Sequence, residues 1–438
     1  MRKTSTLLVF TRFTPLNGLS GTGTYLFSIL SYLHRHGVAV AICWSERPEI
    51  AARRGWWIVP KDLSAIATLL IPGAFAVGRL RIFPSVFMDP LKARLRRALK
   101  TAVLALGLGS RLGISGPQAP ETGECAPAAS SQPSVNPYAW DRPPDPYEHA
   151  FFRQAVAKIQ PDALAFNYCW MTPLVQSLPD PGRFLKMVIT YDLRHIYSTL
   201  VEGKILWSEG DFMSKEAETN YLRLTDLIVA IREDDAETFR TLLPDKEVVT
   251  VYPALEPCPT HSIPLPNRCL FVAADNLANR EGILWFLENA WPIVRAANPQ
   301  AHLQICGTIC KTLTKDYPGV VRLGFVDSLD AVYGEASVVI VPLLRGSGVK
   351  IKLMEAIARG KACVSTPIGA EGVPALDSCV AIAGTADAFA ADVLRLLSDT
   401  TARQGMEERA VATVREHFSA EACYDALRAQ IQKPRPHA

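Results

Sequence analysis

The sequence predicts an α/β protein of two Rossmann-like, doubly wound domains that face a cleft. Three observations predict this fold. The chain has 438 residues, which is long for a single hydrophobic core. Short apolar runs alternate with helical patterns in both halves, which is typical of parallel sheets covered by helices on both faces. Residues 253–268 contain five prolines and read as an extended linker between the halves.

The first half alternates strands and helices loosely, and we assign residues 1–255 to a first domain. Its first apolar run, near the N-terminus, is too short for the core of a signal peptide and reads better as a buried strand. Strands are expected at Thr6–Phe10, Val38–Trp44, Ala163–Tyr168, Met187–Tyr191, Leu227–Ile231 and Val248–Tyr252.

An insertion over about residues 72–146 interrupts this domain. Residues 79–111 hold eight Lys and Arg against one acidic residue, and apolar residues are interleaved with the basic ones. This pattern favours a basic amphipathic helix at an anionic membrane surface, and an ordinary surface helix with a solvated basic face is the alternative. Residues 115–146 carry eight prolines among small and polar residues, which indicates a flexible segment.

The second half alternates more regularly, and we expect a linker over 256–267, a second domain over 268–415, and a C-terminal helix and tail over 416–438. Helices are expected at Gly282–Ala297, Leu329–Glu335, Lys350–Arg359, Ala386–Leu397 and Glu416–Ile431. Strands are expected at Cys269–Ala273, His302–Gly307, Val320–Val326, Ala336–Leu343, Ala362–Thr366 and Val380–Ala383.

Composition narrows the class of protein. Hydrophobic residues make up 49% of the chain and charged residues 20%, which fits a globular protein with a large core. The net charge of +3 is too close to balance to indicate nucleic acid binding. Ten cysteines without a CxxC pair favour buried, reduced thiols and a cytoplasmic location. No stretch is long enough to span a membrane, so any membrane contact would be peripheral, on the inner face.

The most informative segment is residues 342–372, where an apolar strand, a glycine turn and a helix follow one another. The turn, Gly346-Ser347-Gly348, and the helix start present unpaired backbone N–H groups, and Lys350 and Lys352 add positive charge that suits a phosphate. The carboxylate of Glu355, one helical turn further along, suits hydrogen bonding to ribose hydroxyls. This predicts a nucleotide diphosphate site, although neither the P-loop spacing nor the third glycine of a dinucleotide fingerprint is present. The plainer alternative is that the lysines are solvated and Glu355 pairs with Lys352.

The same segment resembles the donor-site signature of the glycosyl transferases group 1, a family with the GT-B fold. The matching residues are Gly346, Gly348, Lys350, Glu355, Ala356, Ala358, Gly360, Thr366, Gly369, Glu371 and Gly372. The resemblance implies an active site in the cleft between two domains and a C-terminal helix that crosses back to the first. It also implies that Arg345, Ser347, Val349 and the backbone near Gly369 contact the donor.

In the first domain, the stretch around Gly21 and Gly23 resembles the family's N-terminal glycine-rich loop, which would let the acceptor or the leaving phosphate approach closely. A tight turn capped by Ser20 or Thr22 is the alternative. Asp192 and His195 end a strand where family members often place a residue near the reacting sugar, although a histidine at a strand end is more often structural. Asp234 and Asp235 look like charges at a helix N-terminus.

The chain departs from the family pattern at two places. Ser347 stands where many members have a second glutamate, which puts the sugar contacts in doubt. Asp275 and Glu281 stand near the positions of an arginine and a lysine that many members have. Phosphate charge would then rest on Arg280, Arg345, Lys350 and Lys352.

The resemblance implies a retaining hexosyltransferase that moves a sugar from a nucleotide-diphosphate sugar to a glycan or lipid-linked acceptor. No Asp-x-Asp pair lies in a suitable loop, so we expect neither metal nor cofactor, and the leaving phosphate would take the acceptor's proton. His195, Asp192, Lys350 and Glu355 are the expected catalytic residues. Two alternatives keep the fold: a GT-B nucleotide-sugar epimerase, and a non-catalytic subunit of an assembly complex.

Overall fold

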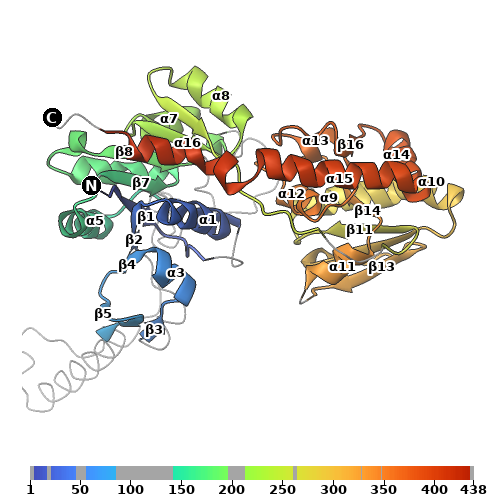
Figure 1. The fold of residues 1–438 in the computed structure, drawn as a ribbon, viewed down its shortest axis with the longest axis horizontal. Helices are drawn as coiled ribbons and strands as arrows, with labels where there is room; N and C mark the ends of the chain where they lie inside the picture. Colours follow the sequence, from blue (N-terminus) through green and yellow to red (C-terminus); the bar gives the residue numbers. More distant parts are fainter. Residues whose placement is uncertain are drawn as a thin grey trace, which may run out of the picture. The chain divides into compact units, whose positions relative to one another are not determined.

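The computed structural model describes residues 4–16, 21–45, 56–84, 142–195, 213–259, 264–326, 328–346 and 348–434. They form two parallel sheets flanked by helices, which confirms the predicted α/β fold class (Figure 1). The chain divides into two compact units. Unit 1 runs to Lys186 and includes Arg194–Leu224; unit 2 contains Met187–Leu193 and the chain from Thr225 onward. The expected domain boundaries at residues 255 and 268 stay a prediction.

The first sheet has seven strands in the order β10-β9-β8-β7-β1-β2-β4. Its strands are β1 (Thr6–Thr11), β2 (Ala39–Trp44), β4 (Thr68–Leu70), β7 (Ala163–Asn167), β8 (Leu185–Ile189), β9 (Leu227–Ala230) and β10 (Glu247–Thr250). The pairs that β1 makes with β2 and β7 are parallel, with Leu8 opposite Ala41 on one side and Leu164 on the other. Both strand faces are buried, so β1 is an almost uninterrupted apolar run, as expected for a parallel sheet.

Helices connect the strands of the first sheet. They are α1 (Gly21–Arg35), α3 (Lys61–Ile66), α5 (Pro146–Ile159), α7 (Lys215–Leu222) and α8 (Glu233–Leu242), with the 3-10 segments η1 (Cys169–Ser177) and η2 (Pro181–Arg183). The helix α5 begins with a complete capping box: Asp145 accepts from the Glu148 N–H, and Glu148 accepts from the Asp145 N–H.

A small antiparallel sheet of three strands, in the order β3-β6-β5, lies within unit 1. It comprises β3 (Trp56–Ile58), β5 (Phe75–Val77) and β6 (Leu80–Ile82). The sequence analysis missed this sheet and placed β5 and β6 in an insertion, because three-residue strands are too short to show a period. The rest of the basic stretch, residues 85–111, and the proline-rich residues 115–141 lie outside the described residues.

The second sheet, wholly in unit 2, has six parallel strands in the order β13-β12-β11-β14-β15-β16. Its strands are β11 (Arg268–Val272), β12 (His302–Cys306), β13 (Val320–Gly324), β14 (Val338–Val341), β15 (Cys363–Ser365) and β16 (Val380–Ile382). The order reverses between β11 and β14, and the carboxyl ends of strands at such a reversal are where ligands bind in open α/β sheets. Buried side chains such as Phe271, Ile305 and Phe389 form the core beneath it.

The helices of the second sheet confirm most of the expected pattern. They are α9 (Leu277–Trp285), α10 (Trp291–Ala297), α11 (Leu329–Glu335), α12 (Ile351–Ala358), α13 (Pro367–Ala370), α14 (Ala386–Ser398), α15 (Thr400–His417) and α16 (Ala420–Gln432), with the 3-10 segment η4 (Thr308–Lys311). A π-helical turn over Phe286–Ala290 joins α9 to α10. The helix expected at Gly282 therefore begins earlier, where Asn276 accepts from the Asn279 N–H as its N-cap.

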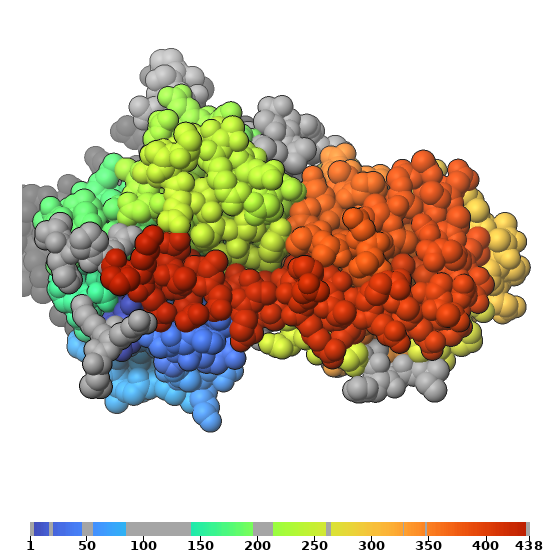
Figure 2. All heavy atoms as spheres, turned by 45° about the horizontal axis from the view of Figure 1, so that its top comes forward, coloured from blue at the N-terminus to red at the C-terminus, as the bar shows by residue number. Residues whose placement is uncertain are grey.

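The expected C-terminal helix over Glu416–Ile431 is present as α16, but it begins at Ala420 rather than at Glu416. The chain leaves helical geometry at Phe418, and Ser419 caps the start of α16 by accepting from the Ala422 N–H. In Figure 2 the two helices form a continuous ridge that passes beside α8. Within unit 2, the Tyr424 hydroxyl accepts from the Ala254 N–H at 2.8 Å.

Two further expectations concern cysteines and membrane spans. The nine cysteines that the structure describes are all free, and seven of them are buried. None of the helices in the described ranges is long and apolar enough to cross a membrane.

Candidate active site

The predicted donor loop connects β14 to α12 at the carboxyl edge of the second sheet. Gly346 has a φ of 142° and Gly348 a φ of 68°, both in the region that favours glycine. These values explain why two glycines stand in the turn. Ser347, between them, lies outside the described residues. Val349 follows the turn, and its carbonyl accepts from the Ile351 N–H at 3.1 Å.

Lys350 is folded back over this loop rather than directed into solvent. Its side chain is buried, with the residue only 5% exposed, and Nζ donates to the carbonyl of Gly348 at 2.8 Å and of Gly346 at 3.4 Å. Nζ also lies 3.8 Å from Oε2 of Glu371. Burial lowers the pKa of Lys350 to about 8, against the raising effect of Glu371. The alternative of a solvated helix charge is therefore wrong for Lys350.

Lys352 and Glu355 lie on one side of α12, three residues apart. Nζ of Lys352 donates to Oδ1 of Asn279 at 2.8 Å, and Nδ2 of Asn279 donates to the Ala274 carbonyl at the same distance. Burial and the charge of Lys350 lower the pKa of Lys352 to about 8. Burial raises the pKa of Glu355, and Arg359 and Lys352 oppose that rise. The structure thus brings a buried lysine, Lys350, together with the half-buried Lys352 and Glu355 at one helix start.

Both arginines predicted to reach phosphate are engaged with carboxylates. Nε and Nη2 of Arg280 lie 2.5 and 2.9 Å from the two oxygens of Asp275. Nε of Arg345 lies 2.6 Å from Oε2 of Glu281. Asp275 and Glu281 are the residues that replace basic residues of the family pattern, so each substituted carboxylate neutralises one candidate phosphate ligand.

The sequence analysis missed the role of Arg232 and Glu371. Arg232 occupies the N-cap position of α8 without a side-chain capping bond. Its Nε lies 2.8 Å from Oδ1 of Asp235, and its Nη1 lies 3.4 Å from Oε2 of Glu371. Glu371 therefore links Arg232 to Lys350 within unit 2. Gly372 has a φ of 73°, which favours glycine, and a Cβ there would lie 2.6 Å from Cδ of Arg232, so a larger residue would displace the Arg232 side chain. In the sequence, the signal for these contacts was the adjacent pair Glu371-Gly372 in the family motif.

Two glycines bring the elements of this site close together. A Cβ on Gly369 would lie 2.6 Å from the Val341 carbonyl oxygen, at the end of β14. A Cβ on Gly282 of α9 would lie 2.4 Å from the Pro342 carbonyl oxygen. The first was predicted from the motif and the second was missed. Tight packing of α9 on the loop holds Asn279 where it can accept from Lys352.

In unit 1, His195 follows β8 and is held by a buried carboxylate. Nδ1 of His195 lies 2.6 Å from Oε2 of Glu218 on α7. The two oxygens of Glu218 also accept from the backbone N–H groups of Arg194 and His195, at 3.1 and 3.0 Å. Three hydrogen bonds fix this carboxylate, which in turn orients the imidazole and directs Nε2 away from Glu218. Glu218 gave no signal in the sequence because it lies 23 residues further along the chain, on α7.

The other predicted residues of the first domain are spread out. Gly21 is the first residue of α1, where a Cβ would meet nothing within 4 Å. Gly23 is buried on the same helix, and Asp192 is partly buried after β8. Tyr168 directly follows β7 and has a φ of 79°, unusual for a non-glycine residue. Its hydroxyl lies 3.3 Å from Oγ1 of Thr22. Tyr168 is a residue that the sequence pattern does not mark.

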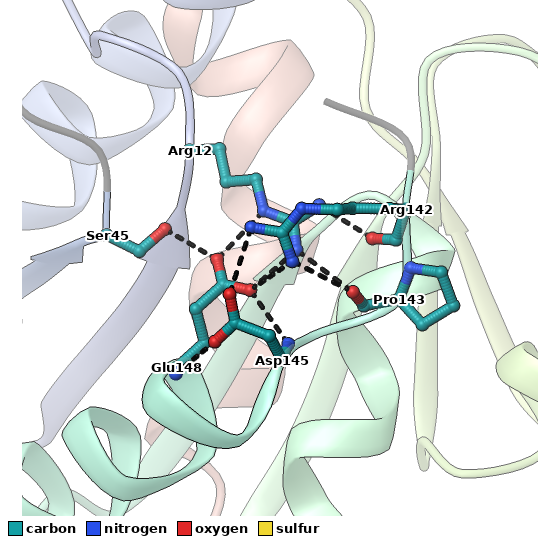
Figure 3. A network of polar contacts seen from close by, with 6 residues as sticks. All are labelled: Arg12, Ser45, Arg142, Pro143, Asp145 and Glu148. Atoms are coloured by element: carbon teal, nitrogen blue, oxygen red, sulfur yellow. Dashed lines mark hydrogen bonds and ion pairs between the residues drawn. The ribbon is translucent and has the colours of Figure 1, made fainter. Parts of the chain in front are cut away.

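A buried ion pair fixes the carboxyl ends of β1 and β2 in unit 1 (Figure 3). Nε and Nη2 of Arg12 donate to the two oxygens of Glu148, at 2.9 and 2.7 Å, and Nη1 donates to the Arg142 carbonyl at 2.6 Å. Oγ of Ser45 donates to Glu148 at 2.9 Å. Burial raises the pKa of Glu148, but the hydrogen bonds and charge of Arg12, with Asp145 and Ser45, lower it to about 2. The network ties residues 142–148 to the sheet edge.

Comparison with known families and structures agrees with this geometry. Residues 266–399 match the family model described as Glycosyl transferases group 1. This part of the chain is a group 1 glycosyltransferase domain. The predicted family resemblance and the glycosyltransferase class of the enzyme are thereby confirmed. The matched range contains the whole loop from β14 to α12, so Lys350, Lys352 and Glu355 belong to the group 1 domain.

Solved structures of low sequence identity share the fold. The TarM structure aligns with a TM-score of 0.62, 10% identity and 99% coverage of each chain. Sucrose-phosphate synthase from Thermosynechococcus elongatus aligns with a TM-score of 0.60, 13% identity and 97% coverage of each. HepE from Anabaena, in complex with UDP and glucose, aligns with a TM-score of 0.59 and 10% identity over 98% of this chain and 99% of that one. The GT-B fold extends beyond the group 1 domain.

One curated protein is similar over a short stretch of the chain. The "Uncharacterized 44.6 kDa protein in cps region" of Klebsiella pneumoniae is 30% identical over 105 residues. The alignment spans 22% of this chain and 27% of that protein. In the described part of the chain, no group of three or more His, Cys, Asp or Glu side chains is arranged to hold a metal ion.

Proposed function

We propose that this protein transfers a sugar, with retention and without a metal or other cofactor, from a nucleotide-diphosphate sugar to a glycan or lipid-linked acceptor. The assignment of the protein to the glycosyltransferases rests on the match of residues 266–399 to the group 1 family. The donor, the stereochemistry and the acceptor are the proposed part.

One observation carries the proposal: Lys350, which is buried, and Lys352, which is half-buried, stand at the start of α12 behind a glycine loop, and burial lowers the pKa of each to about 8. A buried cation without a full charge partner is unfavourable, and a bound diphosphate would relieve that cost. The helix start adds backbone N–H groups and a favourable dipole. The same charges stabilise the negative charge that builds on the leaving diphosphate.

The contacts around Lys350 suggest which side chains would bind the donor. Nζ of Lys350 donates to loop carbonyls and pairs only loosely with Glu371, at 3.8 Å, so it can turn to phosphate oxygens without losing a strong ion pair. Glu355 would accept from the ribose hydroxyls. Arg280 and Arg345 would reach phosphate only by leaving Asp275 and Glu281, so we assign them a secondary role.

His195 is proposed to position the acceptor or the reacting sugar. Its Nδ1–H donates to Glu218, so Nε2 is the acceptor atom available for a sugar hydroxyl. The leaving phosphate takes the acceptor's proton, so His195 orients the hydroxyl rather than serving as an obligatory base. Asp192, three residues before His195, stays a candidate for contact with the acceptor or the reacting sugar.

The test is a calorimetric screen of UDP, GDP and ADP, followed by product analysis with sugars of the nucleotide that binds. UDP comes first because HepE, of the same fold, is known in complex with UDP and glucose. Transfer to an added glycan or lipid-linked acceptor supports the proposal. A changed sugar on the nucleotide without transfer would instead indicate an epimerase. No binding of any of the three would favour a non-catalytic subunit.

A further inference from the structure

Glu371 lies between two cationic side chains of unit 2. Its Oε2 is 3.4 Å from Nη1 of Arg232 and 3.8 Å from Nζ of Lys350. Lys350 is assigned to the donor's phosphate in the proposed function, and Arg232 approaches the same carboxylate oxygen from the start of α8. Arginine and lysine bind carboxylate and phosphate oxygens in the same way. A phosphate oxygen could therefore take the position that the Glu371 oxygen holds.

Arg232 is fixed on one side of its guanidinium and only loosely engaged on the other. Nε donates to Oδ1 of the buried Asp235 at 2.8 Å, which sets the plane of the group. Nη1 is buried and makes no hydrogen bond within the described ranges, although it lies 3.4 Å from Glu371 and 3.8 Å from Asp234. A buried charged donor without a hydrogen bond is unfavourable, so a better placed acceptor would stabilise it.

The turn that carries Glu371 fits closely against Arg232. The angles of Glu371, φ −55° and ψ 136°, and the φ of 73° at Gly372 fit a type II turn. The Val373 N–H closes this turn by donating to the Ala370 carbonyl at 3.3 Å. A Cβ on Gly372 would lie 3.2 Å from Nη1 of Arg232. The glycine thus leaves room for the guanidinium beside the turn.

Glu371 is the side chain of this group that can move. It is 43% exposed, whereas the side chain of Arg232 is 12% exposed and that of Lys350 is 4% exposed. Its two ion pairs, at 3.4 and 3.8 Å, are longer than good hydrogen bonds. Ion pairs of an exposed carboxylate contribute little to stability, so moving this one into solvent costs little.

We propose that Glu371 holds the place of a phosphate oxygen until the donor binds, and that Arg232 is a further residue that binds the diphosphate. The inference deepens the proposed function and rests on the same donor site. The diphosphate displaces the Glu371 carboxylate toward solvent and takes both cations, with Arg232 donating through Nη1. Glu371 is thus a competitor of the donor rather than one of its ligands.

This role predicts a sign that two other roles do not. If Glu371 bound the donor itself, removing its charge would weaken binding. If its ion pairs served only the fold, removing the charge would lower the melting temperature and leave the affinity unchanged. A competitor behaves differently, because its removal makes the two cations available and tightens binding.

The test is calorimetric titration of inorganic pyrophosphate and of UDP into the full-length protein. A pH of about 6.5 keeps the titration below the pKa of about 8 of Lys350, which Glu371 helps to raise. Glu371→Gln should bind pyrophosphate roughly three- to tenfold more tightly than the wild type, since it keeps the shape and removes the competing charge.

Glu335→Gln is the matched control for the loss of one negative charge. The side chain of Glu335 is 47% exposed and pairs with Arg268 at 3.9 Å. Arg268 begins β11, so this pair lies at the edge of the second sheet opposite the donor loop. The control variant should bind pyrophosphate as the wild type does.

The contribution of Arg232 is tested in a double variant, Arg232→Gln with Asp235→Asn. The second change prevents the buried Asp235 from being left without its cation, which could unfold the protein. Pyrophosphate binding should weaken roughly 10- to 100-fold, the worth of a charged hydrogen bond. A melting temperature close to that of the wild type shows that the fold is retained.

Three results would overturn the inference: Glu371→Gln binds pyrophosphate no more tightly than the wild type, the double variant keeps wild-type affinity, or none of these proteins binds pyrophosphate. The proposed function fails separately. If pyrophosphate binds in the expected order but UDP, GDP and ADP do not bind, the anion site stands and the sugar transfer is lost. If sugar is transferred from a UDP-sugar while the variants bind as the wild type does, the function stands and this inference is lost.

Discussion

The two lysines of the donor loop have pKa values that give the protein a testable pH response. Both values lie near 8 in the folded protein, below the ordinary 10.5. Between these values the unfolded chain holds protons that the folded chain has released, so the free energy of unfolding of the ligand-free protein should rise with pH. A nucleoside diphosphate binds the protonated lysines, so its affinity should fall over the same range.

Denaturant unfolding and calorimetry at about pH 7.5 and about pH 9.5 measure the two responses. Lys350→Met combined with Lys352→Met should flatten both, because the titrating groups are gone. A nucleotide affinity that stays constant across this range in the wild-type protein would show that neither lysine contacts phosphate.

We expect Glu218 to support activity by orienting His195, in addition to stabilising the fold. We expect His195→Ala to lower kcat/KM roughly tenfold, the value of one lost hydrogen bond to the reacting groups, with little change in melting temperature. Glu218→Gln replaces one of the two accepting oxygens by an amide NH2, so one backbone N–H loses its acceptor and stability should also fall by about 1–3 kcal/mol.

Nitrogen-15 NMR of the His195 ring separates the two roles. The wild-type ring should carry its proton on Nδ1, hydrogen-bonded to Glu218, and Glu218→Gln should shift that signal. If the tautomer of His195 is the same in both proteins, Glu218 is a structural residue only.

At the scale of elements, the close packing of α9 on the donor loop depends on Gly282. Gly282→Ala would place a methyl group 2.4 Å from the Pro342 carbonyl oxygen, which is backbone and cannot turn away. We expect a loss of roughly 1–3 kcal/mol of stability, as for other overpacked sites, together with weaker nucleotide binding. Gly405→Ala in α15 is the control, because the nearest atom there is the flexible end of Arg409 at 3.2 Å.

The control should stabilise the protein by roughly 0.5–1 kcal/mol, the usual gain for replacing a helical glycine. Thermal and denaturant unfolding of both variants provide the comparison. Equal effects of the two substitutions would contradict the tight packing of α9 on the donor loop.

Most elements of the fold are evident in the sequence because parallel strands buried on both faces read as continuous apolar runs. Val338–Val341 and Leu227–Ala230 are examples, and the structure moves their expected ends by one or two residues. The missed elements are those without such a signal. The small sheet has strands of three residues, and the break between α15 and α16 depends on the cap at Ser419 rather than on periodicity.

The candidate site was predictable where its residues are close in sequence. The glycine turn, both lysines and Glu355 fall in ten consecutive residues, so their motif is visible. Glu218 and Arg232 join the site residues only through folding, by contacts across 23 and 139 residues. The carboxylate partners of Arg280 and Arg345 were noticed as departures from the family pattern, but the ion pairs they form required the structure.

At the scale of the whole molecule, the ion pair of Arg12 and Glu148 secures the point where the chain re-enters unit 1 at residues 142–148. Arg12→Met would leave the buried Glu148 with only the partly exposed Arg142 as a cationic partner, 3.0 Å from Oε2, and would cost roughly 3–5 kcal/mol. Arg12→Met with Glu148→Leu removes both charges and should recover much of that loss. Denaturant unfolding of the single and double variants checks this, and additive losses would rule out the coupling.

The central claim is that the loop from Gly346 to Lys350 and the start of α12 bind the diphosphate of a nucleotide sugar. The most direct test is calorimetric titration of UDP, or whichever nucleoside diphosphate binds best, into the wild-type protein and three variants. Lys350→Met and Glu355→Gln should each weaken binding roughly 10- to 100-fold, the worth of a charged hydrogen bond, with melting temperatures close to wild type. Lys315→Met, which removes an exposed lysine elsewhere in unit 2, should bind as the wild type does. Wild-type affinity in both Lys350→Met and Glu355→Gln would show that this loop is not the donor site.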